Sequence, residues 1–241
     1  MRIVLDATSE VGQRAGRVLM AEGDLDFLGL WDAAGAPRQR RSGPVDDVAG
    51  FDVVVTDRTE HLHDLLAHAA VAGTPVVMWI DDAGIPPGRS TIPLIVGANV
   101  GSALGDALSH HPMARPSTDE VMTIAWTEPG RPRRRGVAAA FPDPVGMVWS
   151  KERGPGRLAA RTDGEWAAAS VVIEGDGERR IVGVSDHAAH LEGLVLAATA
   201  WIAGEGAYPS TGAQPAANAG AELLDRLMNM ELDVAAWRSS N

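Results

Sequence analysis

The chain has 241 residues, of which 45% are hydrophobic, and this predicts a folded protein of one large or two small domains. It contains no cysteine, which excludes disulfides, thiol nucleophiles and thiolate metal sites. The formal net charge of −11 argues against nucleic acid as a partner. The sequence shows no membrane-spanning apolar run and no signal sequence before its first apolar run, so we expect a cytoplasmic protein without membrane contact.

The first predicted unit is a strand, a turn, a helix and a second strand. An apolar run at 3–5 is followed by apolar residues with helical spacing at 11–19. A second apolar run, 27–31, ends at Asp32. Asp32 lies 20 residues after Gly12, the separation that brings an acid to the ribose hydroxyls of a dinucleotide. The unit is therefore interpreted as a Rossmann-type βαβ unit.

The turn of this unit departs from the glycine pattern of dinucleotide-binding loops. Glycine is expected at three positions, where the chain has Asp6, Ser9 and Gly12. Gly12 preserves the close approach of helix and strand, whereas the carboxylate of Asp6 would repel a diphosphate. Two interpretations stay open. The loop either binds a dinucleotide through Thr8, Ser9, Val11 and Gly12, or is purely structural, with Asp6 capping the helix.

Two signals for the choice of cofactor conflict. Asp32 favours NAD, because its carboxylate would meet the 2′-phosphate of NADP. Arg38, Arg40 and Arg41 follow in a loop predicted over 34–44 from its glycine and proline content, and they would favour NADP. The predicted cofactor is therefore NAD or NADP.

Strands and helices then alternate up to residue 115. Strands are predicted at 51–57, 74–80 and 92–97, and helices at 60–71 and 103–108. This alternation predicts an α/β domain, 1–115, with a parallel sheet covered on both faces. Ligands of such sheets bind beyond the carboxyl ends of the strands, which adds Asp57, Trp79, Asp81 and Asn99 to the expected cofactor contacts.

The pattern changes after residue 115. Strands are predicted at 120–127, 137–141, 145–150, 166–174 and 179–184, followed by helices at 187–203 and 221–230 with a loop at 209–220 between them. Strands in succession and then helices predict an α+β domain, 116–241, with a mainly antiparallel sheet. Because one face of that sheet would be open, we expect a homo-oligomer built on it.

The second domain contains two further candidates for chemistry. His187 is the candidate catalytic acid or base, because histidine suits proton transfer near neutral pH. His187 and His190, with Asp186 and Glu192 nearby, would allow a metal site, but a helix start with its cap explains them better, and no metal is predicted. The basic run 131–135 is interpreted as a solvated loop.

In the order of its landmarks the chain resembles the dihydrodipicolinate reductase family of two-domain NAD(P)-dependent oxidoreductases. The resemblance implies the two-domain fold, a nicotinamide cofactor and a small polar substrate. Its landmarks are 6–12 for the family's Gly-Ala-Thr-Gly-x-x-Gly loop, 52–59 for its Asp-Val-x-Ile-Asp-Phe strand end, 73–84 for its Gly-Thr-Thr-Gly loop, 97–105 for its Ala-Pro-Asn segment and 172–179 for its final hairpin.

One departure from the family limits what the resemblance implies. The family's segment His-His-x-x-x-Lys-x-Asp-x-Pro-Ser-Gly-Thr holds the substrate and assists proton transfer, but the matching residues 127–136 contain neither histidine nor lysine. The chain is thus not expected to be a dihydrodipicolinate reductase. Two functions are considered. One is an NAD(P)-dependent oxidoreductase acting on a C=O or C=N bond of a small polar metabolite. The other is a non-redox relative that has lost the cofactor and acts as a binding protein or cofactor-free enzyme.

Overall fold

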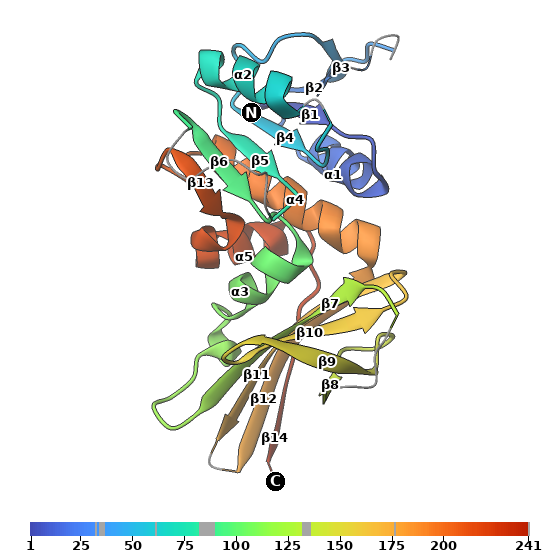
Figure 1. The fold of residues 1–241 in the computed structure, drawn as a ribbon, viewed down its shortest axis with the longest axis vertical. Coiled ribbons are helices and arrows are strands. Elements are labelled where there is room, and N and C mark those ends of the chain that lie inside the picture. The colour runs from blue at the N-terminus through green and yellow to red at the C-terminus, as the bar shows by residue number, and fades with distance from the viewer. Residues whose placement is uncertain are drawn as a thin grey trace. The chain divides into compact units, whose positions relative to one another are not determined.

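The computed structural model describes residues 1–31, 33, 37–60, 62–81, 90–131, 136–175 and 177–240. Contacts group the chain into two compact units (Figure 1). The first comprises Met1–Asn99 and Glu192–Ala219, and the second Val100–Leu191 and Gly220–Asn241. The sequence predicts a single boundary at residue 115, whereas the contacts assign the later segment 192–219 to the first unit.

The first unit is built on a parallel sheet of seven strands within the described residues, in the order β13-β6-β5-β4-β1-β2-β3. This confirms the predicted Rossmann-type parallel sheet. The strands are β1 (Arg2–Asp6), β2 (Phe27–Trp31), β3 (Ser42–Val45), β4 (Val53–Thr56), β5 (Val76–Met78), β6 (Pro93–Val96) and β13 (Gly212–Pro215).

Helices cover both faces of this sheet, because alternate residues of a buried strand point to opposite sides. The helices are α1 (Glu10–Ala21), α2 (Leu62–Ala72) and α4 (Ala188–Gly204). On one face α2 packs with Val4 and Val54 in a common core. On the other face α1 approaches Leu5 through Gly16, and the end of α4 approaches Val53. Within the described residues, no helix is long and apolar enough to cross a membrane.

The second unit contains a mixed sheet in the order β14-β12-β11-β7-β10-β9-β8. Strand β10 runs parallel to β7, and the other described pairs are antiparallel, which confirms the prediction of a mainly antiparallel sheet. The strands are β7 (Val121–Pro129), β8 (Val137–Ala140), β9 (Met147–Gly154), β10 (Arg157–Thr162), β11 (Trp166–Gly175), β12 (Glu178–His187) and β14 (Ala235–Ser240).

Short helical segments pack against one face of this second sheet. They are the π-helix η1 (Val100–Leu104), α3 (Gly105–Leu108) and the 3₁₀ segment η2 (Pro112–Ala114), and α5 (Gly220–Asn229) packs against α3. The 3₁₀ segment η3 (Ala216–Ala219) belongs to the first unit. A side chain at Gly105 would meet Ile124 of β7 at 2.5 Å, so α3 lies directly on the sheet.

Four strands lie where the sequence predicts none. β3 and β13 occupy parts of the segments 34–44 and 209–220, so the prediction of loops there was wrong over those residues. Both strands stand at the edges of the parallel sheet and contain glycine and proline, which edge strands tolerate. β10 and β14 are rich in alanine and polar residues rather than in the β-branched residues that predict strands.

Candidate functional site

The candidate site begins at the turn between β1 and α1. Ser9 is the N-cap of the helix, and its Oγ accepts a hydrogen bond from the backbone N–H of Gly12 at 3.3 Å. The alternative that Asp6 caps the helix is therefore wrong. Asp6 is the last residue of β1, and its side chain contacts Thr56 and Arg58 instead.

The carboxylate of Asp57 fills this turn. It accepts hydrogen bonds from the backbone N–H groups of Thr8 (3.2 Å), Ser9 (3.0 Å) and Gly12 (3.1 Å), and the hydroxyl of Ser9 donates to it as well. Asp57 is 9% exposed. It follows β4, which is the parallel neighbour of β1, so its side chain reaches the same edge of the sheet as the turn.

A helix N-terminus binds anions because its first N–H groups lack partners within the helix. In this chain the anion is the protein's own carboxylate. Gly12 is required for that arrangement, since a Cβ at this position would lie 2.3 Å from Oδ2 of Asp57. Four of the predicted cofactor contacts, Thr8, Ser9, Gly12 and Asp57, are thus brought together, but they bind one another.

A second carboxylate is buried next to this turn. Asp6 is 3% exposed, accepts a hydrogen bond from Oγ1 of Thr56 at 2.9 Å and pairs with Arg58 at 3.1 Å. Burial raises the pKa of Asp6, against the opposing effects of Thr56 and Arg58. The carboxylates of Asp6 and Asp57 and the guanidinium of Arg58 therefore lie at this turn, where a dinucleotide-binding loop has glycine in place of Asp6 and Ser9.

Three of the remaining predicted contacts, Trp79, Asp81 and Asn99, form a second group at the end of β5. The side-chain amide of Asn99 donates to the carbonyl of Trp79 and to Oδ1 of Asp81, both at 2.9 Å. The indole N–H of Trp79 donates to Oε2 of Glu192 at 3.0 Å. This contact of Glu192 with Trp79 was not predicted, because nothing in the sequence around Glu192 places the start of α4 beside β5.

Helix α4 connects the two groups. Gly193 follows Glu192, and a Cβ at Gly193 would lie 2.9 Å from the carbonyl oxygen of Val11 and 2.8 Å from Cβ of Arg14. The start of α4 therefore touches the backbone of α1 while Glu192 reaches Trp79. Val11 contributes to this contact between the helices through its backbone carbonyl oxygen.

One of the residues expected to select NAD or NADP, Arg41, makes other contacts. Asp32 lies outside the described residues. The guanidinium of Arg41 donates to the carbonyl of Leu25 at 2.9 Å and to that of Glu22, so Arg41 holds the chain after α1. This corrects the expectation that Arg41 is available to a 2′-phosphate. A hollow of about 570 Å³ lies beside β1 and β2, lined by residues that include Ala7, Gln13 and Trp31.

His187 lies in the second unit, at the last position of β12 rather than in the helix predicted over 187–203. It is exposed and stacks on Trp166, with ring centroids 4.2 Å apart. Nε2 of His190 lies 3.5 Å from Oδ2 of Asp186. Among the described residues no group of three His, Asp or Glu side chains could hold a metal ion. The catalytic role of His187 stays a prediction.

No protein-family model and no curated protein matches the chain. Solved structures do match it. Dihydrodipicolinate reductase from Paenisporosarcina sp. TG-14 is 11% identical, with a TM-score of 0.51 over 89% of this chain and 97% of that one. DAP dehydrogenase from C. glutamicum is 12% identical, with a TM-score of 0.56 over 95% of this chain and 98% of that one. An engineered D-amino acid dehydrogenase bound to NADP+ is 13% identical, with a TM-score of 0.52 over 95% of this chain and 98% of that one.

The chain has the two-domain fold of these enzymes. This confirms the fold implied by the resemblance to dihydrodipicolinate reductases. The likeness concerns the fold, and the fit of a nicotinamide dinucleotide depends on the local chemistry of the turn. The residues do not fit its pyrophosphate, because Asp57 already accepts three backbone N–H groups of the turn. A diphosphate placed there would also face the carboxylates of Asp57 and Asp6.

Proposed function

We propose that this protein is a non-redox member of the dehydrogenase fold, which binds or transforms a small molecule without a nicotinamide cofactor. The observation that carries the proposal is the carboxylate of Asp57 in the turn at the start of α1. Moving it out of the turn would break its four hydrogen bonds and leave a carboxylate without those partners, and keeping it there opposes a diphosphate by charge. Both alternatives disfavour a dinucleotide.

The backbone N–H groups of Thr8, Ser9 and Gly12 already have an acceptor within the protein, which supports this proposal. The carboxylate compensates the positive end of the α1 dipole, and the hydroxyl of Ser9 occupies the position at which a dinucleotide-binding loop has its middle glycine. The substitutions of glycine by Asp6 and Ser9 are therefore not isolated losses. They belong to an arrangement in which Asp57 takes the role of a bound anion.

An NAD(P)-dependent oxidoreductase acting on a C=O or C=N bond is the second candidate. The hollow beside β1 and β2 favours it, because the volume of about 570 Å³ falls within the range of cofactor sites and its lining includes Trp31. In neither case do we propose reduction of dihydrodipicolinate, because the segment 127–136 lacks the histidine and lysine that assist proton transfer in that family.

Binding of dinucleotides separates the two candidates. We expect NAD, NADH, NADP and NADPH to leave the thermal midpoint of the protein unchanged. A ligand at 100 times its dissociation constant would stabilise the fold by about 2.7 kcal/mol, which corresponds to roughly 5–10 °C for a protein of this size. Differential scanning fluorimetry with each dinucleotide measures this directly.

The panel needs a control for phosphate binding elsewhere in the molecule. It is repeated on the double variant Arg153→Gln/Arg161→Gln, which removes two exposed positive charges of the second unit. A shift that persists in this variant, and disappears when Gly12 is replaced by Ala, would place the dinucleotide in the turn. That result would overturn the non-redox proposal.

The second unit is also proposed to assemble with another copy of the chain. Large apolar side chains are exposed on its strands β8 and β9, namely Val137 (61%), Met147 (71%) and Trp149 (42%). Burying them against a second copy would remove this apolar surface from water. We expect a dimer or larger assembly by light scattering at micromolar concentration, and dissociation in Met147→Asp. A wild-type protein that is monomeric under these conditions contradicts the prediction.

A further inference from the structure

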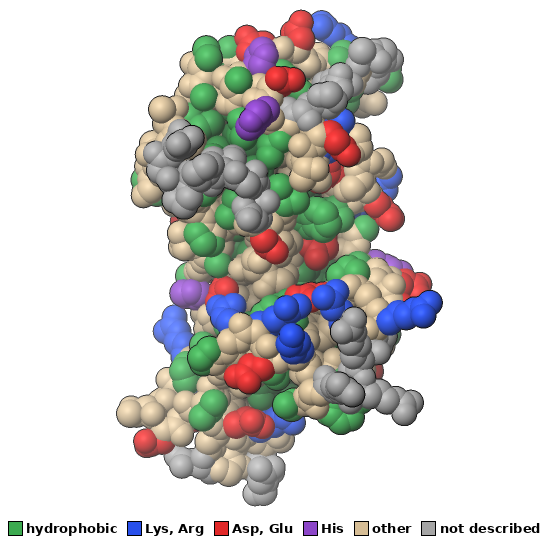
Figure 2. Space-filling view, in the orientation of Figure 1, with side chains coloured by type: hydrophobic (Ala, Val, Ile, Leu, Met, Phe, Trp, Pro, Cys, Tyr) green, Lys and Arg blue, Asp and Glu red, His purple; other side chains and the backbone are tan. Residues whose placement is uncertain are grey.

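A hollow of about 540 Å³ lies on the sheet of the second unit, over strands β9 and β10 and the end of β7. Its lining contains the basic residues Arg131, Lys151, Arg153 and Arg161, and none of the described lining residues is acidic. Figure 2 shows Lys and Arg side chains gathered over these strands. The whole chain has a net charge of −11, so the charge of this pocket lining is opposite in sign to that of the protein as a whole.

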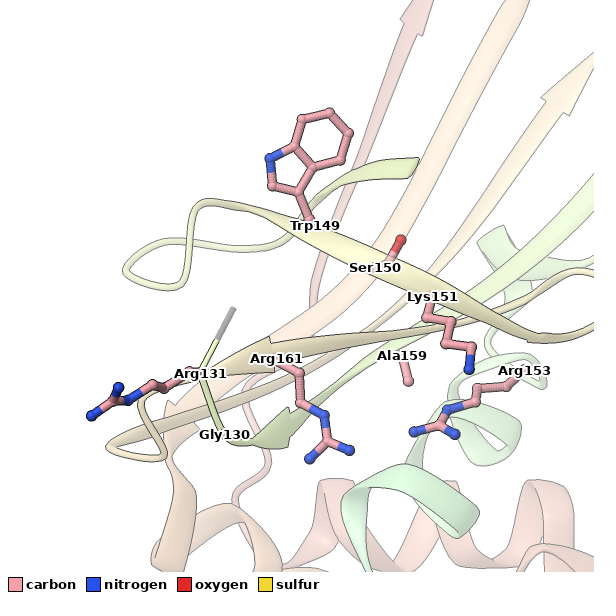
Figure 3. Close-up of a pocket in the computed structure, with 8 residues that line it drawn as sticks. All are labelled: Gly130, Arg131, Trp149, Ser150, Lys151, Arg153, Ala159 and Arg161. Atoms are coloured by element: carbon pink, nitrogen blue, oxygen red, sulfur yellow. The ribbon is translucent and has the colours of Figure 1, made fainter. Parts of the chain in front are cut away.

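The strand register explains why the basic side chains share one face. Lys151 of β9 stands opposite Ala159 of β10, and Arg161 lies two residues beyond Ala159, so alternation places these three side chains on one face. Arg153 lies at an irregularity in the register between β9 and β10. Figure 3 shows the side chains of Lys151, Arg153 and Arg161 extending to the same side of the sheet. Ala159 lies between them, and its small side chain leaves the space that the longer ones surround.

Glu128 holds two of the arginines in place. Its carboxylate lies 2.8 Å from Arg153 and 3.1 Å from Arg161, and Arg161 also donates to the carbonyl of Pro129 at 2.7 Å. Both arginine side chains remain about two-fifths exposed, at 40% for Arg153 and 44% for Arg161. A carboxylate shared by two arginines orients them but does not neutralise the surrounding positive charge.

We propose that this basic pocket binds a small organic anion with at least two carboxylate or phosphate groups. Guanidinium groups recognise both kinds of anion through paired hydrogen bonds, and the volume lies in the range of small-molecule sites. The inference adds a ligand class to the proposed function and rests on it only in assuming a small-molecule ligand, because the pocket residues belong to the second unit and the turn of Asp57 to the first.

Calorimetric titration at constant ionic strength tests the proposal, with citrate and pyrophosphate as probes and acetate as the monovalent comparison. We expect one of the two polyanions to bind at submillimolar concentration, and acetate not to bind. The stronger probe shows whether carboxylate or phosphate is preferred. Arg153→Gln/Arg161→Gln should weaken this binding by about tenfold or more.

Arg238→Gln is the matched control. Arg238 is an exposed arginine of the same unit that pairs with Glu178, away from the pocket lining. Its replacement changes the net charge by one and should alter affinity by about twofold at most. Arg179, which pairs with Glu174, also lies outside the pocket lining. The proposal is overturned if neither polyanion binds, or if the double variant Arg179→Gln/Arg238→Gln weakens binding as much as the pocket variant. Dinucleotide binding that persists in the pocket variant contradicts only the non-redox proposal.

Discussion

Asp57→Ala is expected to lower the free energy of unfolding by about 2–4 kcal/mol, because it leaves three backbone N–H groups and the hydroxyl of Ser9 without their charged acceptor. This corresponds to a fall in the thermal midpoint of roughly 5–15 °C for a protein of this size. Thermal and urea denaturation measure the effect.

The same variant should gain an affinity for inorganic anions. With the carboxylate removed, the start of α1 presents its N–H groups to solvent, and phosphate or sulfate can take the vacated place. Phosphate at 100 times its dissociation constant would restore about 2.7 kcal/mol. The comparison is made in the Arg153→Gln/Arg161→Gln background, so that anions bound in the basic pocket do not contribute.

Asp52→Ala provides the control for this rescue. Asp52 is exposed and accepts a hydrogen bond from the backbone N–H of Arg2, so its loss removes the same charge but opens no turn at a helix start. We expect a smaller destabilisation and no recovery with phosphate. If Asp57→Ala is as stable as the wild type, or if phosphate stabilises both variants equally, Asp57 does not substitute for a bound anion.

Gly193→Val should destabilise the first unit by about 1–3 kcal/mol. A Cβ at Gly193 would lie 2.9 Å from the backbone N of Ala15 and 2.9 Å from the carbonyl oxygen of Val11, so the added side chain meets backbone rather than a movable side chain. The start of α4 must then move away from α1. Chemical denaturation of the purified variant gives the loss in unfolding free energy.

Gly23→Ala is the matched substitution for this experiment. A Cβ at Gly23 has no neighbour within 4 Å, and the position belongs to the same unit. Its effect should stay within about 0.5 kcal/mol of the wild type. Equal stabilities of the Gly193 and Gly23 variants would show that α4 is not packed against the backbone of α1.

The parallel sheet could be predicted because its central strands are short apolar runs separated by helical patterns. Residues 3–5, 27–31 and 53–56 are of this kind, and the structure places strands there. β13 could not be found in this way, because Gly-Ala-Gln-Pro carries no strand signal and becomes a strand only by pairing with β6. Tertiary contacts decide such edge strands.

The residues of the candidate site could be predicted from the sequence, but the hydrogen bonds between them could not. Thr8, Ser9, Gly12 and Asp57 were selected because they follow neighbouring parallel strands, and the structure does bring them together. Counting glycines shows what the turn lacks but not what occupies it. A buried carboxylate bonded to a turn more than forty residues away in sequence depends on the packing of β4 beside β1.

The interleaved order of the two units has a consequence for how the chain acquires its structure. During synthesis β6 emerges long before β13, its partner, and α4 also arrives late, so the first sheet keeps an unpaired edge until residues 192–219 are available. The entropy of closing so long a loop grows only with the logarithm of its length, but contacts between distant segments slow folding. The nascent protein therefore carries an open strand edge, which exposes it to aggregation, until β13 has been synthesised.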